Sequence, residues 1–217
     1  MIEFKDISFS YKRGKGVTNL NFKLEDGEFN FLIGPTGSGK TTLMRLIYLD
    51  LIPDSGTLIV NGFKSKDLSF SKISKVRKEI GMVFQDYKLL NDRNVYDNIS
   101  LPLHVLGYPK NQIYDRVDES LELVGLQNKK HHFPDELSGG EQQRASLARA
   151  IIKEPSLILA DEPTGNLDPV ASFELVRLLE TINETGTTIL MATHNYSLIK
   201  GRGLPIYEIK DGILKQR

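Results

Sequence analysis

The chain has 217 residues, of which 40% are hydrophobic, enough to fill one α/β domain or a core with a small appended subdomain. Lys plus Arg and Asp plus Glu each number 28, so the net charge is zero and does not indicate a nucleic-acid binder. Cysteine is absent, which excludes a disulfide framework or a thiolate metal site.

The first residues, MIEFKDISFSYK, contain no long apolar segment and lack the pattern of a signal peptide. No apolar run approaches the roughly 20 residues that cross a bilayer. We therefore expect a soluble chain, whose attachment to a membrane would need a separate protein.

Residues 1–33 have the alternating pattern of β-strands. The apolar positions, with a slip near Asp6, are Ile2, Phe4, Ile7, Phe9 and Tyr11, then Leu20, Phe22 and Leu24. Tyr11 ends the first strand, before a Lys- and Gly-rich turn at residues 12–16. It either stacks on a nucleotide base, with Val17 packed beside it, or is an ordinary edge-strand aromatic; spacing alone does not decide between them.

The segment 29–47, FNFLIGPTGSGKTTLMRLI, is the strongest motif in the chain. An apolar run, Phe29 to Ile33, predicts a buried strand, and a helix is predicted to begin near Lys40. Between them lies G-x-x-x-x-G-K-[ST], the phosphate-binding P-loop, in the strand–loop–helix context that it requires. A chance match in a Gly-rich turn is disfavoured by that context.

The residue types of this loop suit a bound nucleotide. Glycines at 34, 37 and 39 let the backbone N–H groups point at phosphate oxygens, and the helix N-terminus adds its dipole. Lys40 supplies a full positive charge, and the Thr41 hydroxyl can ligate Mg²⁺. The predicted nucleotide-binding residues are Gly34, Pro35, Thr36, Gly37, Ser38, Gly39, Lys40, Thr41 and Thr42.

Residues 53–110 predict smaller elements: a turn at 53–56, a strand at 57–62, a polar helix-like stretch at 66–80 and a short strand at 81–85. Gln85 ends that strand and could reach a metal or a γ-phosphate, although alone it is more simply an ordinary loop residue. Residues 86–110 have no clean periodicity. We expect an exposed apolar patch there, of the kind that marks partner contacts; its residues are Leu89, Leu90, Val95 and Tyr96.

Two helices are predicted next. The first, at 111–124, has an apolar stripe of Ile113, Val117, Leu121 and Val124. The second begins at Gly139–Gly140, where Ser138 is a strong N-cap and Glu141 completes a capping box. Since the glycines leave the first-turn N–H groups bare, this is a second candidate anion site. The pair His131–His132 more simply has a surface or core role than a metal-binding one.

The strand SLILA, 156–160, is followed by two acids. Asp161 is predicted to hold Mg²⁺, and Glu162 to act as general base on the attacking water. A solvated loop is disfavoured because the P-loop already needs a Mg²⁺ partner. A helix follows Asp168–Pro169; its predicted core face is Val170, Phe173, Val176, Leu179 and Ile182.

A strand at 187–193 leads to His194, which could bind a γ-phosphate, although alone it would more often be structural. The last residues, 206–217, predict a hairpin with its turn at Asp211–Gly212.

The P-loop, Gln85, LSGGE (137–141), LILADE (157–162), NLD (166–168) and His194 occur in an order that resembles the nucleotide-binding subunit of ATP-binding cassette (ABC) transporters. The resemblance covers almost the whole chain, and LSGGE is its most specific part. It implies an α/β P-loop NTPase fold, with a RecA-like core, an antiparallel β-subdomain and a helical subdomain. Residues 1–217 would form a single ABC ATPase domain, with the helical subdomain inserted at about 86–155.

The resemblance also implies a head-to-tail homodimer with two buried ATP molecules. Each ATP would lie on the P-loop of one subunit and under the LSGGE helix of the other, at Ser138, Gly139, Gly140 and Glu141. Tyr11 would stack on adenine, Gln85 would touch Mg²⁺ and the attacking water, and His194 would hold the γ-phosphate. Asp168 would couple the two sites, and residues 86–106 would receive an integral membrane subunit. Asn195 stands where the family usually has an acid.

Within the family, DEPTGNLD and LSGGEQQR are similar to ATPases of lipoprotein release, macrolide export and cell division. The run FQDYKLLNDRNVYDN is most similar to the cell-division members, which act with a membrane protein to control cell-wall hydrolases. The implied location is the cytoplasmic face of the inner (plasma) membrane, through that partner.

The alternatives are the ATPase of a lipoprotein-release or macrolide exporter, an ATP-gated interaction module, and an ABC ATPase of DNA repair or translation. The last is disfavoured because the chain has no coiled-coil insertion, no second cassette and no basic surplus.

Overall fold

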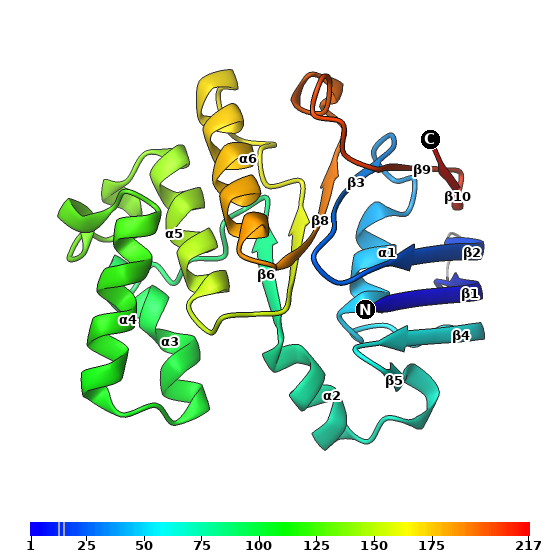
Figure 1. Ribbon diagram of the computed structural model, residues 1–217, viewed down its shortest axis with the longest axis horizontal. Helices are drawn as coiled ribbons and strands as arrows, with labels where there is room; N and C mark the ends of the chain where they lie inside the picture. Colours follow the sequence, from blue (N-terminus) through cyan, green and yellow to red (C-terminus); the bar gives the residue numbers. More distant parts are fainter. Residues whose placement is uncertain (13, 15) are drawn as a thin grey trace.

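The computed structural model describes residues 1–12, 14 and 16–217, which form two β-sheets on either side of helix α1 (Lys40–Ile47) (Figure 1). The antiparallel sheet has the order β2 (Gly16–Leu24), β1 (Ile2–Ser10), β4 (Ser55–Val60) and β5 (Phe63–Lys64). The second sheet has the order β10 (Ile213–Gln216), β9 (Ile206–Lys210), β3 (Phe29–Ile33), β8 (Thr188–Thr193), β7 (Leu157–Asp161) and β6 (Ile80–Phe84). Strands β9 to β6 are parallel, and β10 pairs with β9 as the predicted antiparallel hairpin.

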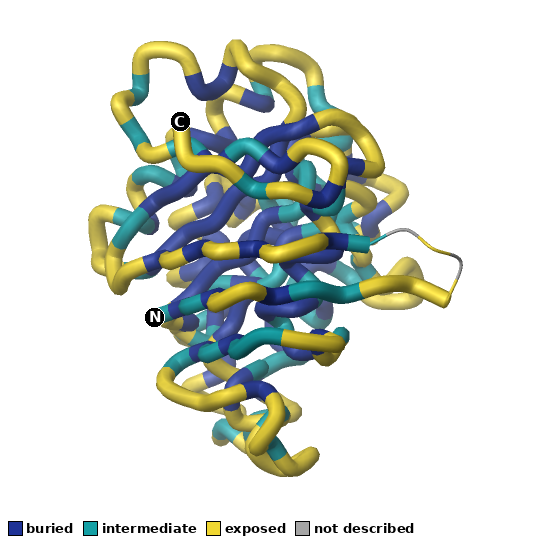
Figure 2. The backbone as a smooth tube through the Cα atoms, turned by 90° about the vertical axis from the view of Figure 1, so that its right-hand side faces the viewer, coloured by how far each residue is buried: buried dark blue, intermediate teal, exposed yellow. Residues whose placement is uncertain are grey.

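The alternation predicted for β1 and β2 is confirmed. Buried and exposed positions succeed each other along these strands (Figure 2), and the slip near Asp6 is a bulge in which Asp6 has a φ of 53°. The inward side chains pack on α1 and on one face of the parallel sheet. This hydrophobic face orients the antiparallel sheet against the core.

The parallel strands are buried on both faces, which explains their continuous apolar sequences. Leu157 and Leu159 of β7 pack toward α1, whereas Ile158 and Ala160 pack toward α5 (Gly139–Ile151) and α6 (Pro169–Glu184). The sheet is therefore the middle layer between α1 and the pair α5 and α6.

The predicted core face of α6 is wrong in its first turn. Val170 is 68% exposed and Phe173 42% exposed, while Val176, Leu179 and Ile182 are buried as expected. The buried stripe begins instead with Ser172 and Leu175, so at the start of the helix the covered face is rotated away from Val170 and Phe173.

A third cluster of buried side chains joins α3 (Val95–Leu106), α4 (Lys110–Leu123) and α5. The stripe predicted for α4 is confirmed, but α3 was not expected. Asn94 caps α3 by accepting from the Asp97 backbone N–H at 2.8 Å, and Gly107, with a φ of 80°, ends it.

The apolar patch expected at 89–96 is mostly not a surface feature. Val95 is 1% exposed because it begins α3 and packs in its core, and Leu89 and Tyr96 are half-buried. Leu90 is the exposed member.

The remaining elements are short. Helix α2 (Phe70–Lys78) buries only Val76, and single-turn 3₁₀ helices lie at Ser65–Asp67, Gln127–Lys129, Pro134–Glu136 and Tyr196–Leu198. None of the helices in the described residues is long and apolar enough to cross a lipid bilayer.

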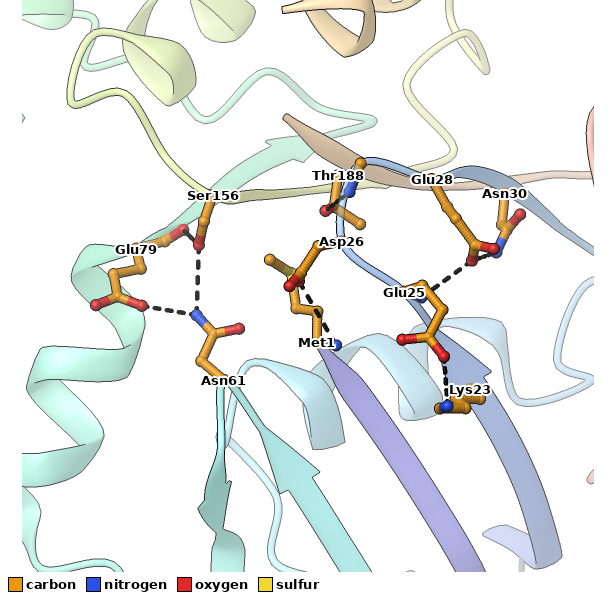
Figure 3. Close-up of polar contacts among 11 residues, drawn as sticks. Met1, Lys23, Glu25, Asp26, Glu28, Asn30, Asn61, Glu79, Ser156 and Thr188 are labelled. Carbon is orange, nitrogen blue, oxygen red and sulfur yellow. Dashed lines mark hydrogen bonds and ion pairs between the residues drawn. The ribbon is translucent and has the colours of Figure 1, made fainter. Parts of the chain in front are cut away.

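Polar contacts fasten the two sheets where the parallel strands begin (Figure 3). The Asn61 amide donates to Glu79 Oε2 at 2.7 Å, and the Gly27 N–H donates to Thr188 Oγ1 at 2.8 Å. These contacts lie at the amino edge of the parallel strands, and the functional side chains follow the opposite, carboxyl edge.

Candidate active site

Neighbouring parallel strands deliver the predicted site residues to one edge of the sheet. In the order β3, β8, β7 and β6, the strands are followed by the P-loop, His194, the pair Asp161–Glu162 and Gln85. Ligands of open parallel sheets bind beyond these carboxyl ends. A cavity of about 480 Å³ opens there; it is lined by Tyr11, Gly16, Thr36, Gly37, Gly39, Lys40, Thr41, Thr42, Gln85, Glu162 and His194.

The P-loop is tightly enclosed at two glycines. Gly34 has a φ of 153°, and a Cβ there would lie 2.1 Å from the Ile209 carbonyl oxygen. Gly39 has a φ of 116°, and a Cβ would lie 2.8 Å from Val17 Cγ1. Only glycine fits at either position, and Val17 packs against the loop rather than into the cavity.

Lys40 is buried and folds back over the loop. Its Nζ donates to the carbonyl oxygens of Gly34 at 2.7 Å and Pro35 at 3.2 Å, and lies 3.0 Å from Glu162 Oε1. The ammonium group is therefore held at the centre of the loop, where a phosphate oxygen can compete for it.

Glu162 is held in a costly backbone conformation, with a φ of 50°. Its Oε2 lies 2.8 Å from His194 Nδ1 and accepts the His194 backbone N–H at 3.2 Å. Its own N–H donates to the Ala192 carbonyl at 3.1 Å. The strand ends of β7 and β8 thus aim this carboxylate and the imidazole at the same cavity.

Asp161 has the properties of a ligand for a hard cation. Its Oδ1 is buried with no hydrogen-bond partner among the described residues. Burial raises the pKa of this carboxyl above its usual range, and the Glu162 charge adds to the effect, whereas Thr41 and Lys40 oppose it. An adjoining cavity of about 320 Å³ brings Asp161 together with Thr41 and Gln85. These residues fit Mg²⁺, which often takes one or two carboxylates together with substrate phosphates.

Tyr11 lies at the mouth of the cavity and is 37% exposed. Its hydroxyl lies 3.4 Å from Thr42 Oγ1 and 3.5 Å from Arg45 Nη1, and its ring meets Phe9 edge-on at 4.9 Å. These contacts hold the ring beside the loop at the mouth of the cavity. Residues 13 and 15 of the turn predicted at 12–16 lie outside the described residues.

Gln85 is held by two residues to which the sequence analysis gave no role. The Asn166 amide donates to the Gln85 carbonyl at 3.0 Å, and Gln85 Nε2 donates to Asn166 Oδ1 at 3.4 Å. A Cβ on Gly165 would lie 2.8 Å from Gln85 Nε2. The available signal was the position of Gly165–Asn166, a few residues after the acid pair.

The other predicted anion site lies elsewhere in the chain. Ser138 Oγ accepts the Glu141 N–H at 3.3 Å, and Glu141 Oε2 accepts the Ser138 N–H at 2.8 Å, so the expected capping box is present. Asp168 caps α6 through Ala171 at 2.9 Å. The two cavities at the P-loop are lined neither by the start of α5, Ser138 to Glu141, nor by Asp168.

Asn195, where an acid is usual, still supports the His194 loop. Its Oδ1 accepts from the Ser197 N–H at 3.1 Å and from the Ser197 hydroxyl at 2.6 Å. The amide oxygen therefore accepts hydrogen bonds as a carboxylate oxygen would.

Comparison with known proteins decides the family. The profile of the family described as "ABC transporter" matches residues 17–165. The cell division ATP-binding protein FtsE of Bacillus subtilis (strain 168) is 42% identical, over 99% of this chain and 94% of that protein. FtsE of Mycobacterium tuberculosis (strain ATCC 25618 / H37Rv) is 45% identical, over 99% and 94%. The chain belongs to the ABC transporter family as an FtsE-type ATPase.

Solved ABC cassettes share the fold of this FtsE-type chain. The cassette MJ0796, in a dimeric post-hydrolysis state bound to ADP and Pi, superposes with a TM-score of 0.90 at 32% identity, covering 100% of this chain and 98% of that one. Subunit cbiO1 of the cbiONQ transporter from Clostridium perfringens gives 0.90 at 30% identity, covering 99% and 86%. The expected ABC ATPase fold is therefore confirmed.

Proposed function

We propose that this FtsE-type chain is the ATP-hydrolysing subunit of a cell-division complex, in which a homodimer encloses ATP and drives an FtsX-like membrane protein that controls cell-wall hydrolases. The observation that carries the proposal is the convergence of Lys40, Glu162, His194 and Gln85 on one cavity at the carboxyl edge of the sheet. Its similarity to FtsE proteins over nearly the whole chain gives the cell-division context.

The chemistry is in-line attack of water on the γ-phosphate, in which positioning and charge stabilisation are the main effects. Lys40 and the P-loop N–H groups neutralise phosphate charge, while Tyr11 stacks on adenine. Glu162 accepts the proton of the attacking water, and His194 orients Glu162 and reaches the γ-phosphate. Thr41, Asp161 and Gln85 would hold Mg²⁺, which would supply further charge neutralisation when bound.

The second helix N-terminus supports a site shared between two copies. The capping box uses the N–H groups of Ser138 and Glu141, which leaves those of Gly139 and Gly140 for a ligand. This helix start lines neither cavity at the P-loop of its own chain, and Asp168 lies at the start of the nearby helix α6. We place the γ-phosphate of the partner's ATP under Ser138, Gly139, Gly140 and Glu141. The dimeric state of MJ0796 supports this arrangement.

We place the membrane subunit on the groove between α2 and α3, rather than on the patch expected at 89–96. The groove has a volume of about 360 Å³. It is lined by Phe70, Ile73, Ser74, Arg77, Lys78, Leu101, Pro102, Val105, Leu106 and Lys153. Phe70 is 85% exposed and Val105 76% exposed. Helix α2 contributes Lys72, Lys75, Arg77 and Lys78 and no acid. The groove therefore suits an apolar segment that carries an acidic side chain, presented at the cytoplasmic face of the plasma membrane.

The test is an affinity pull-down of Glu162→Gln, with ATP, from detergent-solubilised native membranes. We expect recovery of an FtsX-like protein. A lipoprotein-release or macrolide-type permease instead would identify an exporter ATPase. Recovery of no membrane protein, with an intact ATP dimer, would favour an ATP-gated module.

Two further variants locate the docking surface. Val105→Asp should abolish recovery of the membrane protein because it places a charge in the apolar groove, whereas Leu90→Asp, outside the groove, should reduce it less. If Leu90→Asp instead reduces recovery of the membrane protein more than Val105→Asp does, the interface lies at residues 86–96 and not at the groove.

A further inference from the structure

Two consecutive residues just after Gln85 have left-handed backbone conformations. Tyr87 has a φ of 59° and Lys88 a φ of 51°, and neither is glycine. Such a pair costs free energy and persists only where surrounding contacts enforce it. The segment therefore requires a contact that holds it.

That contact is Arg149 of α5. Its Nη1 donates to the Lys88 carbonyl at 2.7 Å and its Nη2 donates to the Tyr87 carbonyl at 2.9 Å, so one guanidinium grips both strained residues. Arg149 is half-buried and has no carboxylate within salt-bridge distance among the described residues. Its charge is thus directed at these two carbonyls, and burial lowers its pKa.

The same helix holds the other side of Gln85. The fully buried Gln143 donates from Nε2 to the Phe84 carbonyl at 3.2 Å. The Tyr87 hydroxyl rests on the first residue of α5, since a Cβ on Gly139 would lie 2.9 Å from it. Helix α5 lies beside β6 (Figure 1) and therefore contacts the chain both before and after Gln85.

We propose that Arg149 is a positioning residue for Gln85: it fastens the strained pair Tyr87–Lys88 to α5, so that Gln85 keeps a fixed position relative to Ser138–Glu141 at the start of that helix. A displacement of α5 is then passed to Gln85 through the guanidinium. This inference rests on the proposed function, in which Gln85 and the start of α5 serve the two ATP sites.

The test compares the full-length parent chain with Arg149→Lys, which keeps the charge but cannot grip two carbonyls in a fork. We expect faster amide exchange at residues 86–90 and a kcat lowered about 10- to 100-fold. ATP affinity should stay within about twofold, because the P-loop is untouched. Lys88→Gly in the Arg149→Lys background should restore part of the rate, since glycine adopts a positive φ freely. Asn91→Gly, where φ is not positive, is the matched control.

The proposal would be overturned if amide exchange at residues 86–90 were as slow in Arg149→Lys as in the parent chain. A parallel loss of ATP affinity and Tm, which indicates a merely structural role, or equal rescue by Asn91→Gly would also overturn it. A parent chain that does not hydrolyse ATP would contradict the proposed function by itself, while the exchange measurement would still decide the role of Arg149.

Discussion

Adjacent acids at the end of β7 have different surroundings, and this difference assigns their roles. Asp161 is half-buried, and its buried Oδ1 has no hydrogen-bond partner among the described residues, whereas Glu162 contacts Lys40 at 3.0 Å and His194 at 2.8 Å. A carboxylate with a buried oxygen that accepts no hydrogen bond stabilises the fold less than a neutral side chain would, but it suits a cation. Glu162 is oriented by two partners and faces the cavity, as a general base should.

Asp161→Asn should therefore stabilise the protein while damaging its activity. The pKa of Asp161 is raised in the folded state, so ionisation costs stability at every pH above the unfolded pKa, and Asn removes that cost. We expect a Tm higher by roughly 2–4 °C in chelator, corresponding to about 1 kcal/mol. Mg²⁺-dependent strengthening of ATP binding should be lost. A lower Tm in chelator, with the Mg²⁺ effect retained, would contradict the assignment.

Variants of Lys40 and Glu162 should affect ATP binding and ATP hydrolysis separately. Lys40→Ala should weaken ATP binding, since a charge at the centre of the P-loop is removed. Glu162→Gln should keep ATP binding and lower steady-state hydrolysis by at least about 100-fold. Equilibrium binding of a fluorescent ATP analogue and phosphate release measure the two effects. Unchanged affinity in the first variant, or parental hydrolysis in the second, would refute the corresponding role.

Some of these residues could be predicted from sequence because their signals are local. The P-loop and the acid pair each follow a short apolar strand, so the spacing alone places them at a strand end. Asn166 also lies close after the acid pair, but its contact with Gln85 could not be predicted, because Gln85 lies 81 residues away and is brought near only by the order of β6 and β7 in the sheet.

At the scale of elements, a half-buried lysine joins α5 to α2. Lys153, just beyond α5, donates from Nζ to the carbonyls of Arg77 at 2.9 Å and Ile80 at 2.7 Å. Burial lowers its pKa from 10.5 to about 8. The contact fixes one wall of the groove to which we assign the membrane subunit.

This lysine predicts a pH-dependent stability. Below about pH 8 Lys153 is protonated in both the folded and the unfolded state, so the cost of burying its charge fully lowers the free energy of unfolding. As pH rises toward 10.5, the folded state releases its proton first, so the free energy of unfolding should increase relative to Lys153→Met. Urea unfolding at about pH 7 and pH 9.5 should show the difference between parent and variant changing by about 1 kcal/mol, allowing for partial exposure. A constant difference would contradict the shifted pKa.

The elements that sequence analysis misjudged have identifiable physical causes. Helix α3 was missed because a polar residue interrupts its apolar stripe: Asn98 is fully buried and bonds the backbone of Leu90, Arg93 and Asn94. Pro102 also lies inside this helix. The start of α6 was misjudged because its buried face begins with Ser172, a polar residue that adds nothing to an apolar pattern.

At the scale of the molecule, the two helix N-termini that we propose as anion sites belong to one chain but not to one cavity. The P-loop precedes α1 between the sheets, while Ser138–Glu141 begin α5 on the other side of the parallel sheet (Figure 1). A second copy, turned head to tail, can bring one of each together around ATP. In this arrangement each ATP site of the FtsE-type cassette is complete only in the dimer.

The most direct test is the solution mass of Glu162→Gln, measured by light scattering with and without Mg²⁺ and ATP. We predict twice the monomer mass with ATP and the monomer mass without it. Adding Ser138→Arg, which blocks the second anion site but not the P-loop, should leave a monomer that still binds ATP. A Glu162→Gln chain that binds ATP and stays monomeric would contradict the shared site, as would a dimer that persists with Ser138→Arg.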